Sequence, residues 1–199
     1  MLNDDAQLAV ARGLRDGSRT AWAELYDAYS SDVWRYVARL VGGNSTVVAD
    51  VVQEVFLAAA RSARSFDASR GTLWTWLLGI AHRQVALHWR GAERVDRWRR
   101  LAEAGAVQIR QWLDDGDSAT DLWDRRELGD LVRGVLANLP TEYATLLTGK
   151  YLDQLSLEQL SLQVGGSVEA TKSKLARARR EFRLQFEQRA GSDRTAYLS

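Results

Sequence analysis

The sequence contains no cysteine, one proline and two histidines among its 199 residues. Without cysteine the chain can form neither disulfides nor thiolate metal sites, and this fits a reducing compartment. A single proline, Pro140, and few alternating β-branched runs favour an all-helical fold. His82 and His88 are six positions apart, so they do not share a helix face as an i,i+4 metal-binding pair would. We therefore expect no bound metal and no cofactor.

Long apolar runs are also missing, since no uninterrupted stretch approaches the roughly 20 residues of a membrane span. The acidic start, MLNDDAQLAV, does not resemble a signal peptide, so we expect a cytoplasmic protein. No glycine-rich phosphate loop or nucleophile motif is present, and an enzymatic function is only weakly supported. The formal net charge is +1, so any binding of nucleic acid must depend on local segregation of charge.

Such segregation is clearest in residues 155–186, LSLEQLSLQVGGSVEATKSKLARARREFRLQF. Ser156 followed by Gln159 predicts the capping box of a short helix, which Gly165 and Gly166 would end with positive φ angles. Ser167 can then cap a second, longer helix. Two helices joined by so tight a turn indicate a helix-turn-helix whose second helix enters a DNA groove.

On the predicted second helix, apolar residues share one side and basic residues lie outside it. The apolar set is Val168, Leu175, Ala178, Phe182 and Phe186, and the basic set is Lys172, Lys174, Arg177, Arg179, Arg180 and Arg183. Residues 167–189 contain seven Lys or Arg and three Glu, a local balance of +4. A basic helix alone could be an ordinary solvated face. The preceding short helix and the turn favour DNA binding.

The N-terminal half predicts helices that are separated at Asp16-Gly17 and at residues 42–44, Gly-Gly-Asn. Ser45 or Thr46 is expected to cap the third of these helices. That helix, TVVADVVQEVFLAAARSAR, buries its valines and exposes Asp50, Gln53 and Glu54. The three polar side chains could be plain solvated surface or a docking face for a basic partner helix.

Residues 65–72, SFDASRGT, have the composition of a loop, and LWTWLLGIAHRQVALHWR then predicts a long helix over 73–90. Trp76 is expected in the core and Trp74 at the surface. The side chains that we expect to point inward are Leu73, Trp76, Leu77, Ile80, Ala81 and Leu87. Eight tryptophans are many for this length, and an exposed one could stack on an unpaired base.

Two long blocks resemble the extracytoplasmic-function sigma factors, the small two-domain sigma subunits of bacterial RNA polymerase. The first is DVVQEVFLAAARSARSFDASRGTLWTWLLGIAHRQVALHWR, and the second is LANLPTEYATLLTGKYLDQLSLEQLSLQVGGSVEATKSKLARARREF. Both occur in the family's order and at its spacing. The resemblance implies an all-α fold of two small helical domains, sigma region 2 at 1–91 and the region 4 helix-turn-helix at 131–190. A partly ordered linker at 92–130 and a tail at 191–199 complete the chain.

The resemblance also implies a set of binding residues. Asp50, Gln53 and Glu54 would bind the clamp helices of core RNA polymerase. The polymerase flap would be a second site of contact with the sigma factor. Strand opening at the promoter −10 element needs a base pocket and cations along the backbone. It would involve Phe66, Asp67, Arg70, Trp74, His82, Arg83 and Arg90. The −35 element would be read by Lys172, Ser173, Lys174 and Arg177.

The expected protein is thus a promoter-specificity factor without catalytic chemistry, monomeric and silenced by an anti-sigma partner. Its acidic linker tract, LDDGDSATDLWDRRE, could imitate nucleic acid or serve as a solvated tether. The alternative function is a stand-alone helix-turn-helix regulator, a class that normally dimerises to read paired half-sites.

Overall fold

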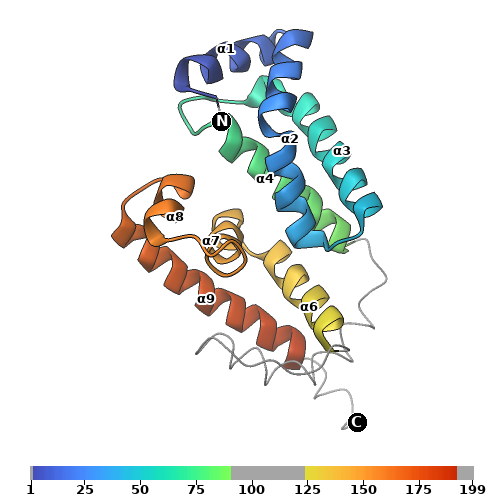
Figure 1. Ribbon diagram of the computed structural model, residues 1–199, viewed down its shortest axis with the longest axis vertical. Helices are drawn as coiled ribbons and strands as arrows, with labels where there is room; N and C mark the ends of the chain where they lie inside the picture. Colours follow the sequence, from blue (N-terminus) through green and yellow to red (C-terminus); the bar gives the residue numbers. More distant parts are fainter. Residues whose placement is uncertain (1, 91–123, 192–199) are drawn as a thin grey trace. The chain divides into compact units, whose positions relative to one another are not determined.

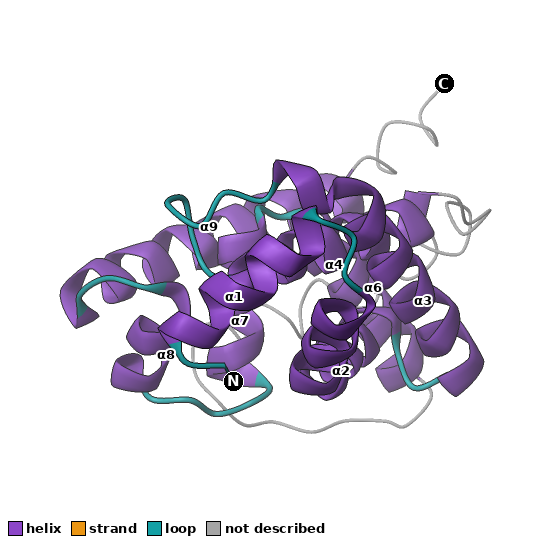
Figure 2. Ribbon diagram, turned by 90° about the horizontal axis from the view of Figure 1, so that it is seen from above, coloured by secondary structure: helices purple, strands orange, loops and turns teal. Residues whose placement is uncertain are grey.

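The computed structural model describes residues 2–90 and 124–191. The chain divides into two compact units, one ending at His88 and the other starting at Trp89. Every regular element in the described ranges is helical (Figure 2), which confirms the all-α, two-domain prediction. The expected partly ordered linker and its acidic tract fall mostly on residues 91–123, outside the described residues, as does the tail after 191.

The first unit contains the helices α1 (Asp4–Arg15), α2 (Arg19–Val41), α3 (Ser45–Ser62) and α4 (Leu73–Arg90), with a 3-10 turn, η1 (Ala63–Ser65), after α3. Gly17 and Gly42 adopt φ angles of 73° and 95° at the two predicted breaks. The expected cap of α3 is wrong by one residue. Asn44, not Ser45 or Thr46, caps the helix, because its Oδ1 accepts hydrogen bonds from the N–H groups of Thr46 and Val47.

The core of the first unit is built around α2, which lies between α3 and α4 (Figure 1) and whose Leu25, Val33 and Val37 are 0% exposed. Burial raises the pKa of the Tyr29 hydroxyl in this core. Helix α1 contributes Val10 and Leu14, and α4 contributes Leu73 and Leu77, all 2% exposed or less. Apolar residues at helical spacing thus bring four helices together around one interior.

The second unit contains α6 (Asp124–Asn138), α7 (Thr141–Tyr151), α8 (Leu157–Val164) and α9 (Val168–Gly191). Pro140 directly precedes α7, as predicted, and supplies the fixed φ that suits a helix start. The predicted core residues Leu131, Val135, Leu136 and Leu139 are all buried. Helix α6 begins at Asp124, before residue 131 where the second domain was expected to start. Figure 1 shows α8 beside the N-terminal end of α9.

Candidate nucleic-acid interface

The turn between α8 and α9 has the geometry that its sequence predicts. Ser156 and Gln159 form a complete capping box at the start of α8. Gly165 and Gly166 have backbone φ angles of 78° and 111°, which residues other than glycine rarely adopt. Ser167 Oγ then accepts a hydrogen bond from the Ala170 N–H at 3.2 Å and caps α9. The starts of α8 and α9 and the turn between them are therefore fixed by interactions within a few residues.

Helix α9 separates its aromatic residues from its cations. Leu175, Ala178, Phe182 and Phe186 are buried, and the two phenylalanine rings stack with centroids 6.0 Å apart. Thr171, which was not expected in this stripe, is 1% exposed. Of the predicted −35 readers, Lys172, Ser173 and Arg177 are exposed to solvent. The basic face is thus available to a polyanion such as the DNA backbone.

Lys174, the fourth predicted reader, differs from the other three. Its side chain is 29% exposed, and its Nζ makes a hydrogen-bonded ion pair with Glu142 Oε1 in the first turn of α7. Residues two apart on an α-helix are separated by about 200° around the axis, so Lys172 and Lys174 lie on opposite flanks. The structure therefore does not bring the predicted basic set together on one face.

Arg180 is a candidate reader that the sequence-based set leaves out. Arg180 is exposed and lies three positions after Arg177, which itself lies four positions after Ser173. Such spacings place side chains on one face of a helix, so Ser173, Arg177 and Arg180 line the outer face of α9. The sequence shows Arg180 as a basic residue outside the apolar stripe, and its helical spacing from Arg177 would have been enough to add it to the predicted readers.

In the first unit, the loop 66–72 presents polar side chains to solvent. Asp67, Ser69 and Arg70 are all exposed. Asp67 Oδ1 accepts hydrogen bonds from the Ser69 hydroxyl at 2.7 Å and from the Ser69 N–H at 2.9 Å. These two bonds, the hydroxyl bond first, lower the pKa of the Asp67 carboxyl. The loop is therefore preformed, with a carboxylate and a guanidinium on its outside.

Helix α1 supports the start of α4, where this loop ends. The side-chain Oε1 of Gln7 accepts a hydrogen bond from the Leu73 N–H at 3.2 Å. That N–H is in the first turn of α4, where no backbone carbonyl of the same helix is available. A residue distant in sequence thus caps the helix and holds the loop's C-terminal end.

Two aromatic members of the predicted −10 set are buried. Trp74, expected at the surface, is 8% exposed and stacks on Tyr29 with ring centroids 6.0 Å apart. Phe66 is 7% exposed and packs against Trp76, whose own side chain is half-buried. Stacking on an unpaired base needs an open ring face, which neither Phe66 nor Trp74 offers in this structure.

His82 is also buried, with 6% of its surface exposed, and its Nδ1 lies 2.8 Å from the hydroxyl oxygen of Tyr36. The structure therefore does not expose the His82 ring for a direct contact with DNA. Arg83 and Arg90 are exposed, like the loop arginine. The cations expected beside the −10 element are accessible, and the aromatic and imidazole rings are not.

The errors on α4, which concern Trp74, His82 and Leu87, share one cause, which is the rotation of α4 about its axis. The buried residues are Leu73, Trp74, Leu77, Leu78, Ala81, His82, Val85 and Trp89. Leu87, expected inside, is 46% exposed, and Ile80 is only partly buried. Because α4 has apolar residues on almost every side, periodicity alone does not determine which side is the inner one.

The third predicted surface lies on α3. Asp50, Gln53 and Glu54 are exposed, as expected, while Val48, Val51, Val52 and Val55 are buried beneath them. Beside α3 is an open groove that the sequence did not indicate. Its lining residues, most of them on α2, are Tyr26, Ser30, Ser31, Trp34, Arg35 and Val52.

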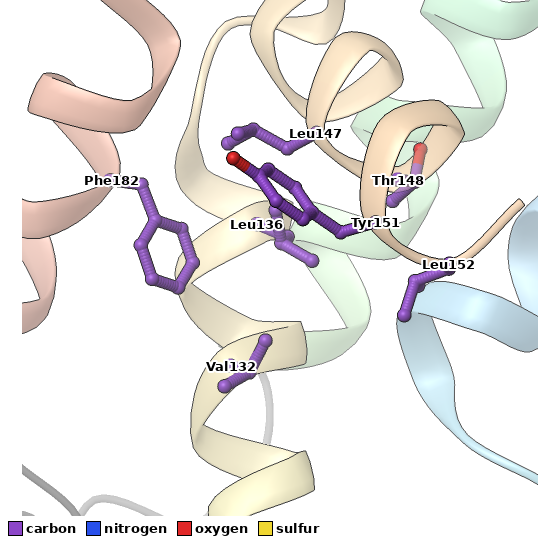
Figure 3. A pocket seen from close by; sticks show the side chains of 7 residues that line it. All are labelled: Val132, Leu136, Leu147, Thr148, Tyr151, Leu152 and Phe182. Carbon is purple, nitrogen blue, oxygen red and sulfur yellow. The ribbon is translucent and has the colours of Figure 1, made fainter. Parts of the chain in front are cut away.

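The second unit has an apolar recess (Figure 3). It is lined by residues of α6, α7 and α9 and by the residue that follows α7. Its lining residues are Val132, Leu136, Leu147, Thr148, Tyr151, Leu152 and Phe182. Leu152, at the C-terminal end of α7, is 50% exposed. An apolar recess of this kind offers a place for an apolar side chain of another molecule.

The family model for sigma-70 region 2 matches residues 25–95, and the model for sigma-70 region 4 matches residues 130–182. The chain is 33% identical over 179 residues to the ECF RNA polymerase sigma factor SigC of Mycobacterium tuberculosis, covering 89% of each protein. The chain belongs to the sigma-70 family, among its ECF sigma factors.

Other ECF sigma factors are similar along most of their length. SigW of Bacillus subtilis is 27% identical over 183 residues, covering 86% of this chain and 92% of the relative. SigK of a Mycobacterium species, strain KMS, is 30% identical over 156 residues, covering 78% and 77%. A solved structure of CnrH in complex with the cytosolic domain of CnrY matches with a TM-score of 0.47 and 20% identity, covering 92% of this chain and 97% of that one.

Three further findings concern the residues that the structure describes. Helix α1, with the residue that caps α4, precedes the match to region 2. In the described ranges, no helix combines the length and apolar character needed to cross a bilayer. Within the same ranges, no group of three acidic, histidine or cysteine side chains is arranged to hold a metal ion.

Proposed function

We propose that this sigma factor binds core RNA polymerase and directs it to promoters, with its second unit reading the −35 element and its first unit opening the −10 element. The observation that carries this proposal is the pair of sigma-70 regions in series, one of which ends in a helix with an exposed basic face. Polymerase supplies the catalysis, because sigma factors as a family regulate transcription without being enzymes.

The −35 contact is assigned to the outer side of α9. Arg177 can pair bidentately with a guanine edge, and Ser173 can bond to any base, while Lys172 neutralises a phosphate from the flank. Arg180 extends this surface by one turn. The buried phenylalanines of α9 pack against the rest of the domain and leave the opposite side of the helix exposed. A helix that reads a DNA groove needs such an exposed side.

The −10 contact is assigned to exposed groups of the loop and of α4. These groups are Asp67, Arg70, Arg83 and Arg90. The cations would follow the backbone of the separated strand, and the preformed carboxylate would accept a hydrogen bond from a base edge. Phe66, Trp74 and His82 would support this surface from within the core.

Core polymerase binding is assigned to two surfaces. Asp50, Gln53 and Glu54 on α3 supply an acidic-polar face for the clamp helices, and the neighbouring groove with Tyr26 and Trp34 adds apolar area. The apolar recess of the second unit is assigned to the polymerase flap. An anti-sigma protein that covers these surfaces would keep the factor silent, and the factor would act in the cytoplasm as a monomer.

Transcription from a library of random upstream sequences by core polymerase tests the proposal. We expect the protein to select promoters that carry two separated boxes, and we expect charge reversal of Asp50 and Glu54 to abolish both polymerase binding and selection. A stand-alone regulator would instead bind paired half-sites as a dimer and select nothing through polymerase. Absence of any selected promoter would refute the proposed function.

A further inference from the structure

The ion pair between α7 and α9 divides the basic residues of the recognition helix into two kinds. Lys174 Nζ contacts Glu142 Oε1, while Lys172 and Arg177 are exposed and form no ion pair in the described ranges; Arg177 Nε donates a hydrogen bond to the Ser173 carbonyl oxygen at 3.4 Å. The two partners come from different helices, 32 positions apart in the sequence. Lys174 lies one i,i+3 step before Arg177, and its ion pair draws its side chain toward α7.

A paired lysine contributes differently to DNA binding from a free one. DNA affinity depends on salt because each lysine or arginine that neutralises a phosphate releases a condensed counterion. An ammonium that already faces a carboxylate presents no net charge, so it releases little. It can reach a phosphate only by leaving its partner.

We propose that Glu142 is a positioning residue that holds Lys174 against α7, so that Lys174 does not read the promoter and the pair limits the factor's affinity for DNA of any sequence. The inference rests on the proposed DNA-binding function and deepens it. It replaces the expectation that Lys172, Ser173, Lys174 and Arg177 act as one set.

The energetic scale of the pair is compatible with this role. Its side chains are 29% and 41% exposed, and exposed ion pairs are modest in strength. A modest pair changes DNA affinity by a small factor without being needed for the fold. Releasing Lys174 should therefore raise non-specific affinity by only about 1.5- to 5-fold at low salt.

The test measures binding of the full-length chain to a short fluorescent duplex of arbitrary sequence across a salt series. Glu142→Gln should make the slope of log affinity against log salt steeper by about 0.9, because one more cation is free to meet a phosphate. Lys174→Gln should leave the slope unchanged. Lys172→Gln and Arg177→Gln should each reduce it by about 0.9.

Two controls separate pairing from general charge and from stability. Glu181→Gln removes a carboxylate from the flank of α9 on which Lys174 lies. Glu181 accepts a hydrogen bond from Gln185, so its removal releases no lysine. It should raise affinity less than Glu142→Gln does and leave the number of phosphate contacts unchanged. In the double variant Glu142→Gln with Lys174→Gln, the steeper slope should disappear, which a mere loosening of α7 would not produce.

The outcomes distinguish this inference from the function on which it rests. If Lys174→Gln reduces the slope as much as Lys172→Gln does, or if Glu142→Gln leaves it unchanged, the pairing role is refuted while DNA binding stands. If the wild-type chain and all variants show no salt-dependent binding, the basic face of α9 is not a DNA-binding surface and both proposals fail.

Discussion

The two units of this sigma factor differ in where the residues predicted to contact DNA lie. In the second unit the predicted readers Lys172, Ser173 and Arg177 are exposed outside a buried apolar stripe, while Lys174 and Arg179 are partly buried. In the first unit three residues of the predicted −10 set, Phe66, Trp74 and His82, are buried, and His82 Nδ1 lies beside the Tyr36 hydroxyl. Function should therefore be separable from stability in the second unit and closely tied to it in the first.

The largest effect that would sharpen this contrast is expected from Trp74→Ala. Removal of the buried ring that stacks on Tyr29 should lower the free energy of unfolding of the first unit by about 3–5 kcal/mol. The exposed control Arg83→Ala should change it by less than about 0.5 kcal/mol. Urea unfolding followed by tryptophan fluorescence measures both. An unaltered stability for Trp74→Ala would mean that the ring is a surface group after all.

The second prediction concerns Arg177→Ala, which should leave stability within about 0.5 kcal/mol of wild type. A lost bidentate contact to guanine should weaken discrimination at the −35 element by about 1–3 kcal/mol, or roughly 5- to 150-fold. Competition binding between a selected promoter and its −35 variants measures this ratio. Arg19→Ala, which removes the same charge from an exposed position in α2, is the matched control.

If Arg177→Ala unfolded the second unit, the separation of function from stability would be wrong there. If Arg19→Ala reduced discrimination equally, the effect would come from net charge and not from a contact.

A smaller effect is expected from Ser167→Ala at the start of α9. Loss of the hydroxyl that caps the Ala170 N–H should destabilise the second unit by about 1 kcal/mol. Ser167→Gly should cost only a few tenths of a kcal/mol, since glycine is itself an acceptable cap. Urea unfolding followed by far-UV circular dichroism compares the two variants. Equal losses would show that the hydroxyl does not cap the helix.

The smallest effect concerns the loop of the first unit. Ser69→Ala removes the shorter of the two hydrogen bonds to Asp67 and should raise the pKa of that carboxyl toward its usual value. Because the folded-state pKa is lowered, the stability that Asp67 contributes is present above the unfolded pKa and is lost as pH falls through the folded pKa. A carboxyl titration by NMR measures the shift, and an unchanged pKa would show that the loop is not held by Ser69.

The fold and the second unit's helix-turn-helix could be predicted because their signals are local. A capping box, two adjacent glycines and a serine cap act within a few residues, and α9 alternates apolar and basic positions clearly enough to assign its inner side. The pairing of Lys174 could not be predicted, since its partner Glu142 is brought near only by the packing of α7 against α9.

The first unit shows the limit of periodicity. In α4 the residues Trp74, Trp76, Leu78 and Ile80 give two plausible apolar sides, and packing against α2 selects the one with Trp74 and His82. The support from Gln7 is likewise a tertiary contact without a motif. The expected exposed face of α3 was correct because its valines leave no second choice.

The measurement that tests the account most directly is selection of transcribed promoters from a library randomised at both boxes, with core polymerase and either wild-type protein or the variant Arg177→Ala. The account predicts that wild-type protein selects two boxes and that the variant loses preference only in the upstream one. Selection of no promoter, or an upstream preference that survives the variant unchanged, would contradict it.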